Sequence, residues 1–115
     1  MQNLDMECAK LGRALAQLEK VDEKTLTSAL GVLEEQGLYA CFLFLNAQGK
    51  DAGRKVSSEL AGFLRQITPL GNGDLFTALQ ALAEDLDRLL FARDLLRQAL
   101  VYGRYHAKAR EAKAQ

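Results

Sequence analysis

The spacing of the leucines is the feature that most constrains the fold of this chain. Apolar residues, most of them leucines, recur three and four residues apart along most of the sequence, and this spacing is typical of amphipathic helices. The first such stripe consists of Leu4, Cys8, Leu11, Leu15 and Leu18. The 115 residues include 22 Leu and 17 Ala but only nine Val, Ile and Thr together, and a single Pro. Because strands favour β-branched residues, a β-sandwich or barrel is excluded. We expect an all-α protein.

The pattern predicts a compact bundle of about five helices with a long C-terminal helix, built as a single helical domain over residues 1–115. The first helix begins near Leu4 with Asn3 as its N-cap, and either Asp22 or Thr25 caps the second. Asp51 and Asp74 are the expected N-caps of the third and fourth. The last helix runs from about residue 85 to the C-terminus.

The second helix is expected over about residues 25–46, but its second half is ambiguous. Residues 38–45 are apolar on every side, so periodicity alone does not separate a buried strand from a buried helix. The spacing of Leu26, Leu30 and Leu33 leads directly into this run and favours a helix. Gly37 would weaken such a helix by roughly 1 kcal/mol relative to Ala.

Several classes of function are disfavoured by what the sequence lacks. With one His, and with Cys8 and Cys41 separated by 32 residues, neither a paired-His zinc site nor a Cys-x-x-Cys motif can form in one chain. The carboxylates of Glu34-Glu35 and of residues 84–87 are expected to be solvated. No secretory signal and no transmembrane run is visible. We expect a cytoplasmic protein with free thiols, no metal, no cofactor, no membrane association and no enzymatic activity.

The last helix has three faces instead of two. At about 100° per residue, one side carries the residues expected to face the core, from Leu89 to Ala107. Roughly opposite lies a second apolar face, made of Phe91, Leu95, Tyr102 and Tyr105. A helix at the edge of a bundle needs one apolar face only. The second face is therefore either buried within the chain or a contact surface for a partner or another copy.

Positive charge gathers on the same helix, between its two apolar faces. Residues 88–115 hold seven Lys and Arg against two acidic residues, although the whole chain is formally neutral. Arg93, Arg97, Arg104 and Lys108 fall within about 60° of one another and span about 22 Å at 1.5 Å per residue. Such a stripe is either solvated surface that complements the helix dipole or a track for several phosphates.

In order along the chain, these features resemble the small α-helical subunit of type III CRISPR effector complexes, particularly the Cmr-complex small subunit. The resemblance covers about residues 25–110. It rests on three features. The first is the Gly37-Leu38 step with the apolar run that follows, and the second is the Gly49-Lys50 loop with the helix after it. The third is the Leu-rich final helix, whose end combines aromatic, basic and Ala residues over positions 102–109.

The resemblance implies a non-catalytic subunit that stacks along the effector filament. Its partners would be the backbone subunits that carry guide RNA, the large polymerase-like subunit and further copies of itself. A basic surface would hold the backbone of the guide RNA and target RNA without reading sequence. The residues nominated for RNA-backbone contact are Arg93, Arg97, Arg104, Lys108 and Arg110, with Arg54 and Lys55 from the third helix as outlying candidates.

Two other interpretations remain open at this point. The first is a self-associating helical adaptor with no role in nucleic-acid binding. The second is a small DNA-binding regulator with a recognition helix after a tight turn, but the expected helix over residues 75–82 carries no Arg or Lys with which to read a groove.

Overall fold

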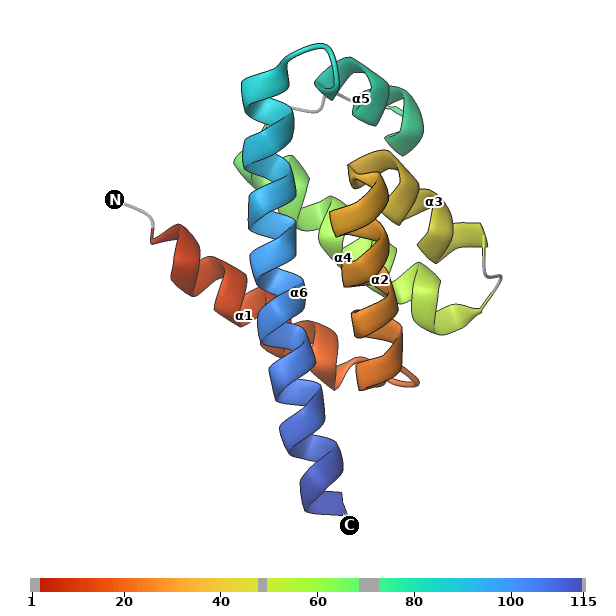
Figure 1. Ribbon diagram of the computed structural model, residues 1–115, viewed down its shortest axis with the longest axis vertical. Helices are drawn as coiled ribbons and strands as arrows, with labels where there is room; N and C mark the ends of the chain where they lie inside the picture. The colour runs from red at the N-terminus through yellow and green to blue at the C-terminus, as the bar shows by residue number, and fades with distance from the viewer. Residues whose placement is uncertain (1–2, 48–49, 69–72, 115) are drawn as a thin grey trace.

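A helix of 29 residues, α6 (Leu86–Ala114), runs through nearly the whole length of the molecule in the computed structural model (Figure 1). The structure describes residues 3–47, 50–68 and 73–114. Their regular structure is helical, with no strand, so the all-α prediction and the long C-terminal helix are confirmed. The other helices are α1 (Leu4–Gln17), α2 (Glu23–Gln36), α3 (Leu38–Ala47), α4 (Asp51–Ile67) and α5 (Leu75–Leu82).

Six helices occur in the described ranges, in line with the expected bundle of about five, and the additional helix comes from a division of the second one. The segment expected as one helix over residues 25–46 is divided at Gly37. The backbone of Gly37 has φ +99° and ψ −175°, a conformation that is nearly exclusive to glycine. The Gly37 N–H closes α2 by donating to the carbonyls of Leu33 and Val32, and α3 begins at the next residue. Residues 38–45 are helical, as favoured.

The helix starts follow the sequence at three of four predicted caps. The side chains of Asn3, Asp22 and Asp74 accept hydrogen bonds from the backbone N–H three residues later, at 3.1, 2.9 and 3.2 Å. The backbone N–H and then the hydroxyl of Thr25 lower the pKa of Asp22. The Asp51 prediction is wrong: Lys50 is the N-cap of α4, without a side-chain cap, and Asp51 is already helical.

The core draws on all six helices, and α6 packs most extensively against α1 and α2. In Figure 1, α2 runs alongside α6 in the opposite direction and α1 crosses α6 below its middle, while α5 lies near the start of α6. The fully buried side chains come from all the helices except α5, and the largest of them include Phe42, Leu15, Leu26, Leu60 and Leu96. Of the predicted core face of α6, the positions from Ala92 to Ala107 are buried and Leu89 is half-buried.

The crossing of α1 and α6 depends on two glycines. A Cβ added at Gly12 would lie 2.6 Å from both the backbone nitrogen of Gly103 and the Cβ of Tyr102. At Gly103 an added Cβ would lie 3.2 Å from the Gly12 carbonyl oxygen. The backbones of α1 and α6 therefore approach closely at this crossing, and we call the side of α6 that is turned away from α1 its open side.

Two further expectations concern positions outside the described residues. The expected Gly at the end of α3, Gly49, and most of the breaker from Pro69 to Asn72 are among them. Within the described ranges, no helix combines the length and the apolar character needed to cross a membrane.

Candidate nucleic-acid interface

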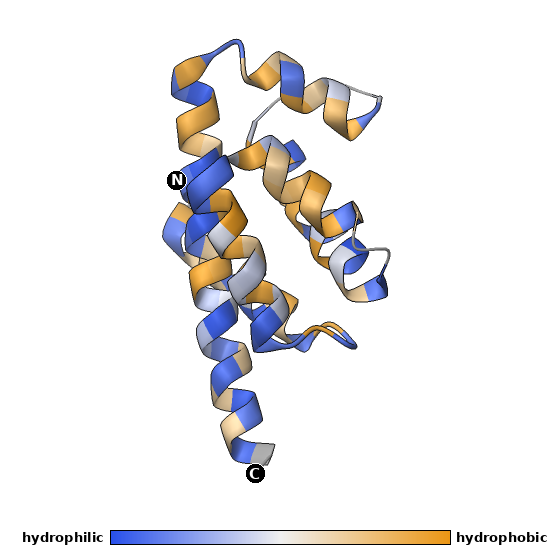
Figure 2. Ribbon diagram, turned by 45° about the vertical axis from the view of Figure 1, so that its right-hand side comes forward, coloured by the Kyte–Doolittle hydropathy of each residue, from blue (hydrophilic) through white to orange (hydrophobic). Residues whose placement is uncertain are grey.

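Three cations on the open side of α6 form the basic ridge, by which we mean Arg93, Arg104 and Lys108. Arg93 and Arg104 are half-exposed and Lys108 is exposed. Across the described parts of the chain, no hydrogen bond or ion pair reaches any of the three side chains. Hydropathy colouring shows the C-terminal half of α6 as predominantly hydrophilic (Figure 2). The ridge therefore offers three cations that no hydrogen bond or ion pair among the described residues engages.

Arg97 belongs to the same stripe in sequence but differs in its partner. Its Nε donates to Oε1 of Glu34 on α2 at 3.0 Å, and both side chains are about half exposed. An exposed ion pair of this kind contributes only about 0.2–1 kcal/mol to stability. Arg97 therefore contributes less net charge to the open side than the three ridge cations.

Three other nominated cations lie away from the ridge. The guanidinium of Arg110 donates to the carbonyls of Ala16 and Val21, so it faces the end of α1, more than about 90° from the ridge around the helix axis. On α4, Arg54 pairs with Asp51 at 2.8 Å, and the Nζ of Lys55 donates to the Glu19 carbonyl at 3.3 Å. The structure does not bring these residues together with Arg93, Arg104 and Lys108.

The second apolar face of α6 is covered only in part by the chain itself. Leu95 and Tyr102 pack against the core. The Tyr102 hydroxyl donates to Asp5 at 2.9 Å, and the Leu95 carbonyl accepts from the Cys8 thiol at 3.4 Å. Phe91 and Tyr105 are instead 46% and 64% exposed. Helix α1 thus covers the first pair and leaves the second pair exposed.

Two leucines that the sequence interpretation did not assign extend this surface. Leu86 is 64% exposed and Leu90 is 42% exposed, in the first turns of α6. At about 100° per residue both align with the basic ridge, on its N-terminal side. Their four-residue spacing from each other, continued by Arg93 and Arg97, is the signal that could have identified them. The open side of α6 is therefore apolar at its start and cationic farther along.

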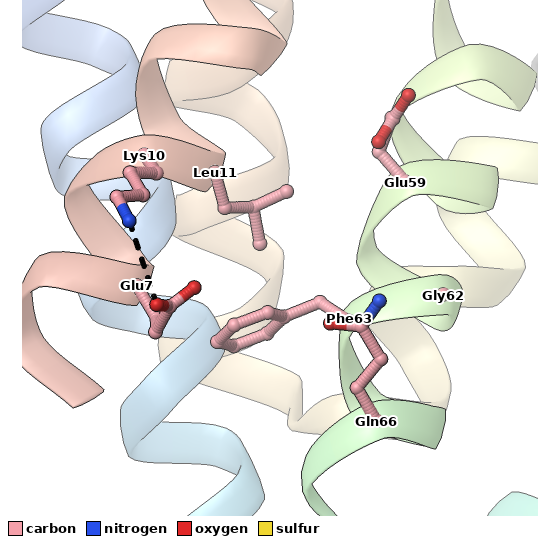
Figure 3. A pocket seen from close by; sticks show the side chains of 7 residues that line it. All are labelled: Glu7, Lys10, Leu11, Glu59, Gly62, Phe63 and Gln66. Carbon is pink, nitrogen blue, oxygen red and sulfur yellow. Dashed lines mark ion pairs between the residues drawn. The ribbon is translucent and has the colours of Figure 1, made fainter. Parts of the chain in front are cut away.

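The cleft between α1 and α4 has no arrangement typical of catalysis (Figure 3). Glu7 pairs with Lys10 at 3.7 Å on α1, and Phe63 reaches from α4 toward that pair. Glu59 projects from α4 away from Glu7, so the two carboxylates do not converge. Among the described residues, no group of three or more His, Cys, Asp and Glu could hold a metal ion.

The two cysteines are both buried and free. Burial, with the carboxylates of Asp5 and Glu7, raises the pKa of the Cys8 thiol to about 11. Burial alone raises the pKa of Cys41 to about 12. Because the thiolate is the nucleophile, neither residue is activated at neutral pH.

No protein-family model, no curated protein and no solved structure matches this chain. The similarity to small subunits of type III CRISPR complexes therefore stays a prediction from the sequence.

Proposed function

We propose that this protein is a non-catalytic, cytoplasmic small subunit of a type III CRISPR ribonucleoprotein. In this role it stacks beside the backbone subunits and the large polymerase-like subunit, and it holds the guide–target RNA by its phosphates. The basic ridge of Arg93, Arg104 and Lys108 supplies the RNA contact. The exposed apolar residues of α6 supply the contact with neighbouring subunits or other copies.

The observation that carries the proposal is the ridge of three cations without a hydrogen bond or ion pair among the described residues. Its cations span about 22 Å of one rigid helix, which is long enough to meet several phosphates. Lys and Arg gain affinity for nucleic acid through the release of condensed counterions, whatever the base sequence. Contacts of this type position a duplex and do not read it, as a subunit that serves many guides requires.

The nearby aromatic and leucine side chains support the second half of the proposal. Leu86 and Leu90 are exposed in the first turns of α6, in line with the ridge, and Phe91 and Tyr105 are exposed about four turns apart on the neighbouring second apolar face. Protein contact surfaces are enriched in aromatic residues and flanked by polar ones. Helix α6 can therefore meet neighbouring subunits through its exposed apolar residues and RNA through the ridge.

The ridge is tested by reversing its charge in Arg93→Glu/Arg104→Glu/Lys108→Glu. We expect RNA-duplex affinity to fall at least tenfold while helicity, measured by circular dichroism, is unchanged. The control variant Arg54→Glu/Lys55→Glu changes charged residues that lie off the ridge, and it should bind within about threefold of wild type. Equal affinity of wild type and the triple variant would reject the ridge as the RNA contact.

The CRISPR assignment is tested separately, by purification of the protein from its native host with sequencing of the RNA that accompanies it. We expect repeat-derived guide RNA together with the effector backbone subunits. RNA without repeat-derived sequences, or no RNA at all, would reject the assignment.

A self-associating adaptor is the second candidate, favoured by the exposure of Phe91 and Tyr105. It predicts that the chain self-associates without RNA, that this association persists at high salt, and that Phe91→Ser/Tyr105→Ser abolishes it. Analytical ultracentrifugation measures both properties. A wild-type chain that stays monomeric would remove this alternative.

A further inference from the structure

Basic residues from two helices line a pocket on the other side of α6, between that helix and the end of α1. The pocket has a volume of about 260 Å³. Arg13 comes from α1, and His106, Arg110 and Lys113 come from α6. The small side chains of Ala16 and Ala109 leave the space between them open.

The spacing of these residues explains why they converge. Positions 106, 110 and 113 are four and three residues apart and share one face of α6, and positions 13 and 16 share one face of α1. The close crossing at Gly12 and Gly103 brings these two faces together. The residues from α1 and the residues from α6 are far apart in sequence, so the cluster exists only in the folded protein.

The pocket combines a fixed guanidinium with free positive charge. Arg110 is anchored by the carbonyls of Ala16 and Val21. Arg13, His106 and Lys113 are exposed, and no hydrogen bond or ion pair from the described residues reaches their side chains. No acidic residue is among those that line the pocket. Arg13, Arg110 and Lys113 therefore repel one another until an anion occupies the space between them.

We propose that this pocket binds a phosphate monoester. Such a group carries a charge of about −1.5 to −2 at pH 7 and three terminal oxygens, which match cations approaching from two helices. A carboxylate offers one charge, and an internal RNA phosphodiester also offers one. The pocket is independent of the basic ridge, because the two lie on different sides of α6 and share no residue.

The test uses adenosine 5′-monophosphate and adenosine as a matched pair of probes, followed by NMR of the backbone amides in the full chain. We expect the monophosphate to shift amides near residues 13–17 and 106–113, and adenosine to leave them unchanged. In Arg13→Glu/Lys113→Glu the affinity for the monophosphate should fall at least tenfold. Both substituted side chains are exposed, so the variant should fold as wild type does.

The control is Arg104→Glu/Lys108→Glu, which carries the same change in net charge on the opposite side of α6. It should bind adenosine 5′-monophosphate within about twofold of wild type. Equal shifts with both probes, or equal losses of affinity in both variants, would overturn the proposal, since binding would then not depend on the phosphate or on this pocket.

The source of the phosphate is distinguished by two further probes, inorganic phosphate and an RNA decamer with or without a 5′-phosphate. At least threefold tighter binding of the 5′-phosphorylated decamer than of its 5′-hydroxyl form, lost in Arg13→Glu/Lys113→Glu, assigns the pocket to an RNA end. Displacement of the monophosphate by inorganic phosphate without that difference assigns it to free phosphate compounds. Either result supports a phosphate pocket. The proposal is contradicted if inorganic phosphate does not displace the monophosphate and the two decamers bind equally.

Discussion

On the side of α6 that faces α1, Tyr102 and Arg110 each find a partner in their own chain, whereas on the open side Tyr105 and Lys108 find none among the described residues. The pairs are chemically similar and nearly adjacent in sequence. What separates them is the position of α1, which the contact between Gly12 and Gly103 fixes. Residue type thus supplies the aromatic and basic groups, and packing decides which of them stay available to a partner.

The largest effect is expected where the two sides are defined, at the crossing of α1 and α6. We predict that Gly12→Ala lowers the free energy of unfolding by about 3 kcal/mol. The new Cβ would overlap the backbone nitrogen of Gly103 and the Cβ of Tyr102, and neither atom can move aside without a shift of the α6 backbone. Urea denaturation measures the change. The matched control is Gly31→Ala in α2, where an added Cβ meets nothing within 4 Å; it should stabilise the protein by about 0.5–1 kcal/mol. Similar changes in both variants would contradict the account of the crossing.

A smaller effect is expected from the cations on the two sides. Arg110→Ala should lower the free energy of unfolding by about 1–2 kcal/mol, because the carbonyls of Ala16 and Val21 lose their charged donor. Lys108→Ala should change it by less than about 0.5 kcal/mol, as is usual for exposed residues. Thermal unfolding of the two variants makes the comparison. Equal losses would mean that Lys108 also has a structural role.

The smallest stability difference is expected between the two tyrosines. Tyr102→Phe removes the hydroxyl that donates to Asp5 and should cost about 0.5–1 kcal/mol, because this bond is exposed. Tyr105→Phe should leave the free energy of unfolding unchanged within error. Chemical denaturation at pH 7 resolves the two variants. A larger loss in Tyr105→Phe would show that the second apolar face is divided differently.

Much of this fold could be predicted from local sequence patterns. The leucine spacing and Asn3 predicted α1, and the uninterrupted final segment predicted α6. The break at Gly37 could not be predicted in the same way, because the apolar pattern continues across it and only the backbone conformation of Gly37 separates α2 from α3.

The candidate site was predictable only in part. Helical periodicity placed Arg93, Arg104 and Lys108 on one face. It could not reveal that Arg97 pairs with Glu34, which lies 63 residues away in sequence. The basic pocket was missed for the same reason, since Arg13 and Lys113 meet through tertiary packing and share no local pattern.

The central claim is that the basic ridge of α6 binds RNA through its three unpaired cations. The salt dependence of RNA binding tests this claim most directly. The slope of log affinity for an RNA duplex against log salt concentration reports the number of phosphate contacts, at about 0.7–0.9 per cation. We predict that Arg93→Gln/Arg104→Gln/Lys108→Gln reduces the magnitude of this slope by about 2–3, whereas Arg54→Gln/Lys55→Gln leaves it unchanged. A slope that is the same in wild type and in the triple variant would contradict the claim.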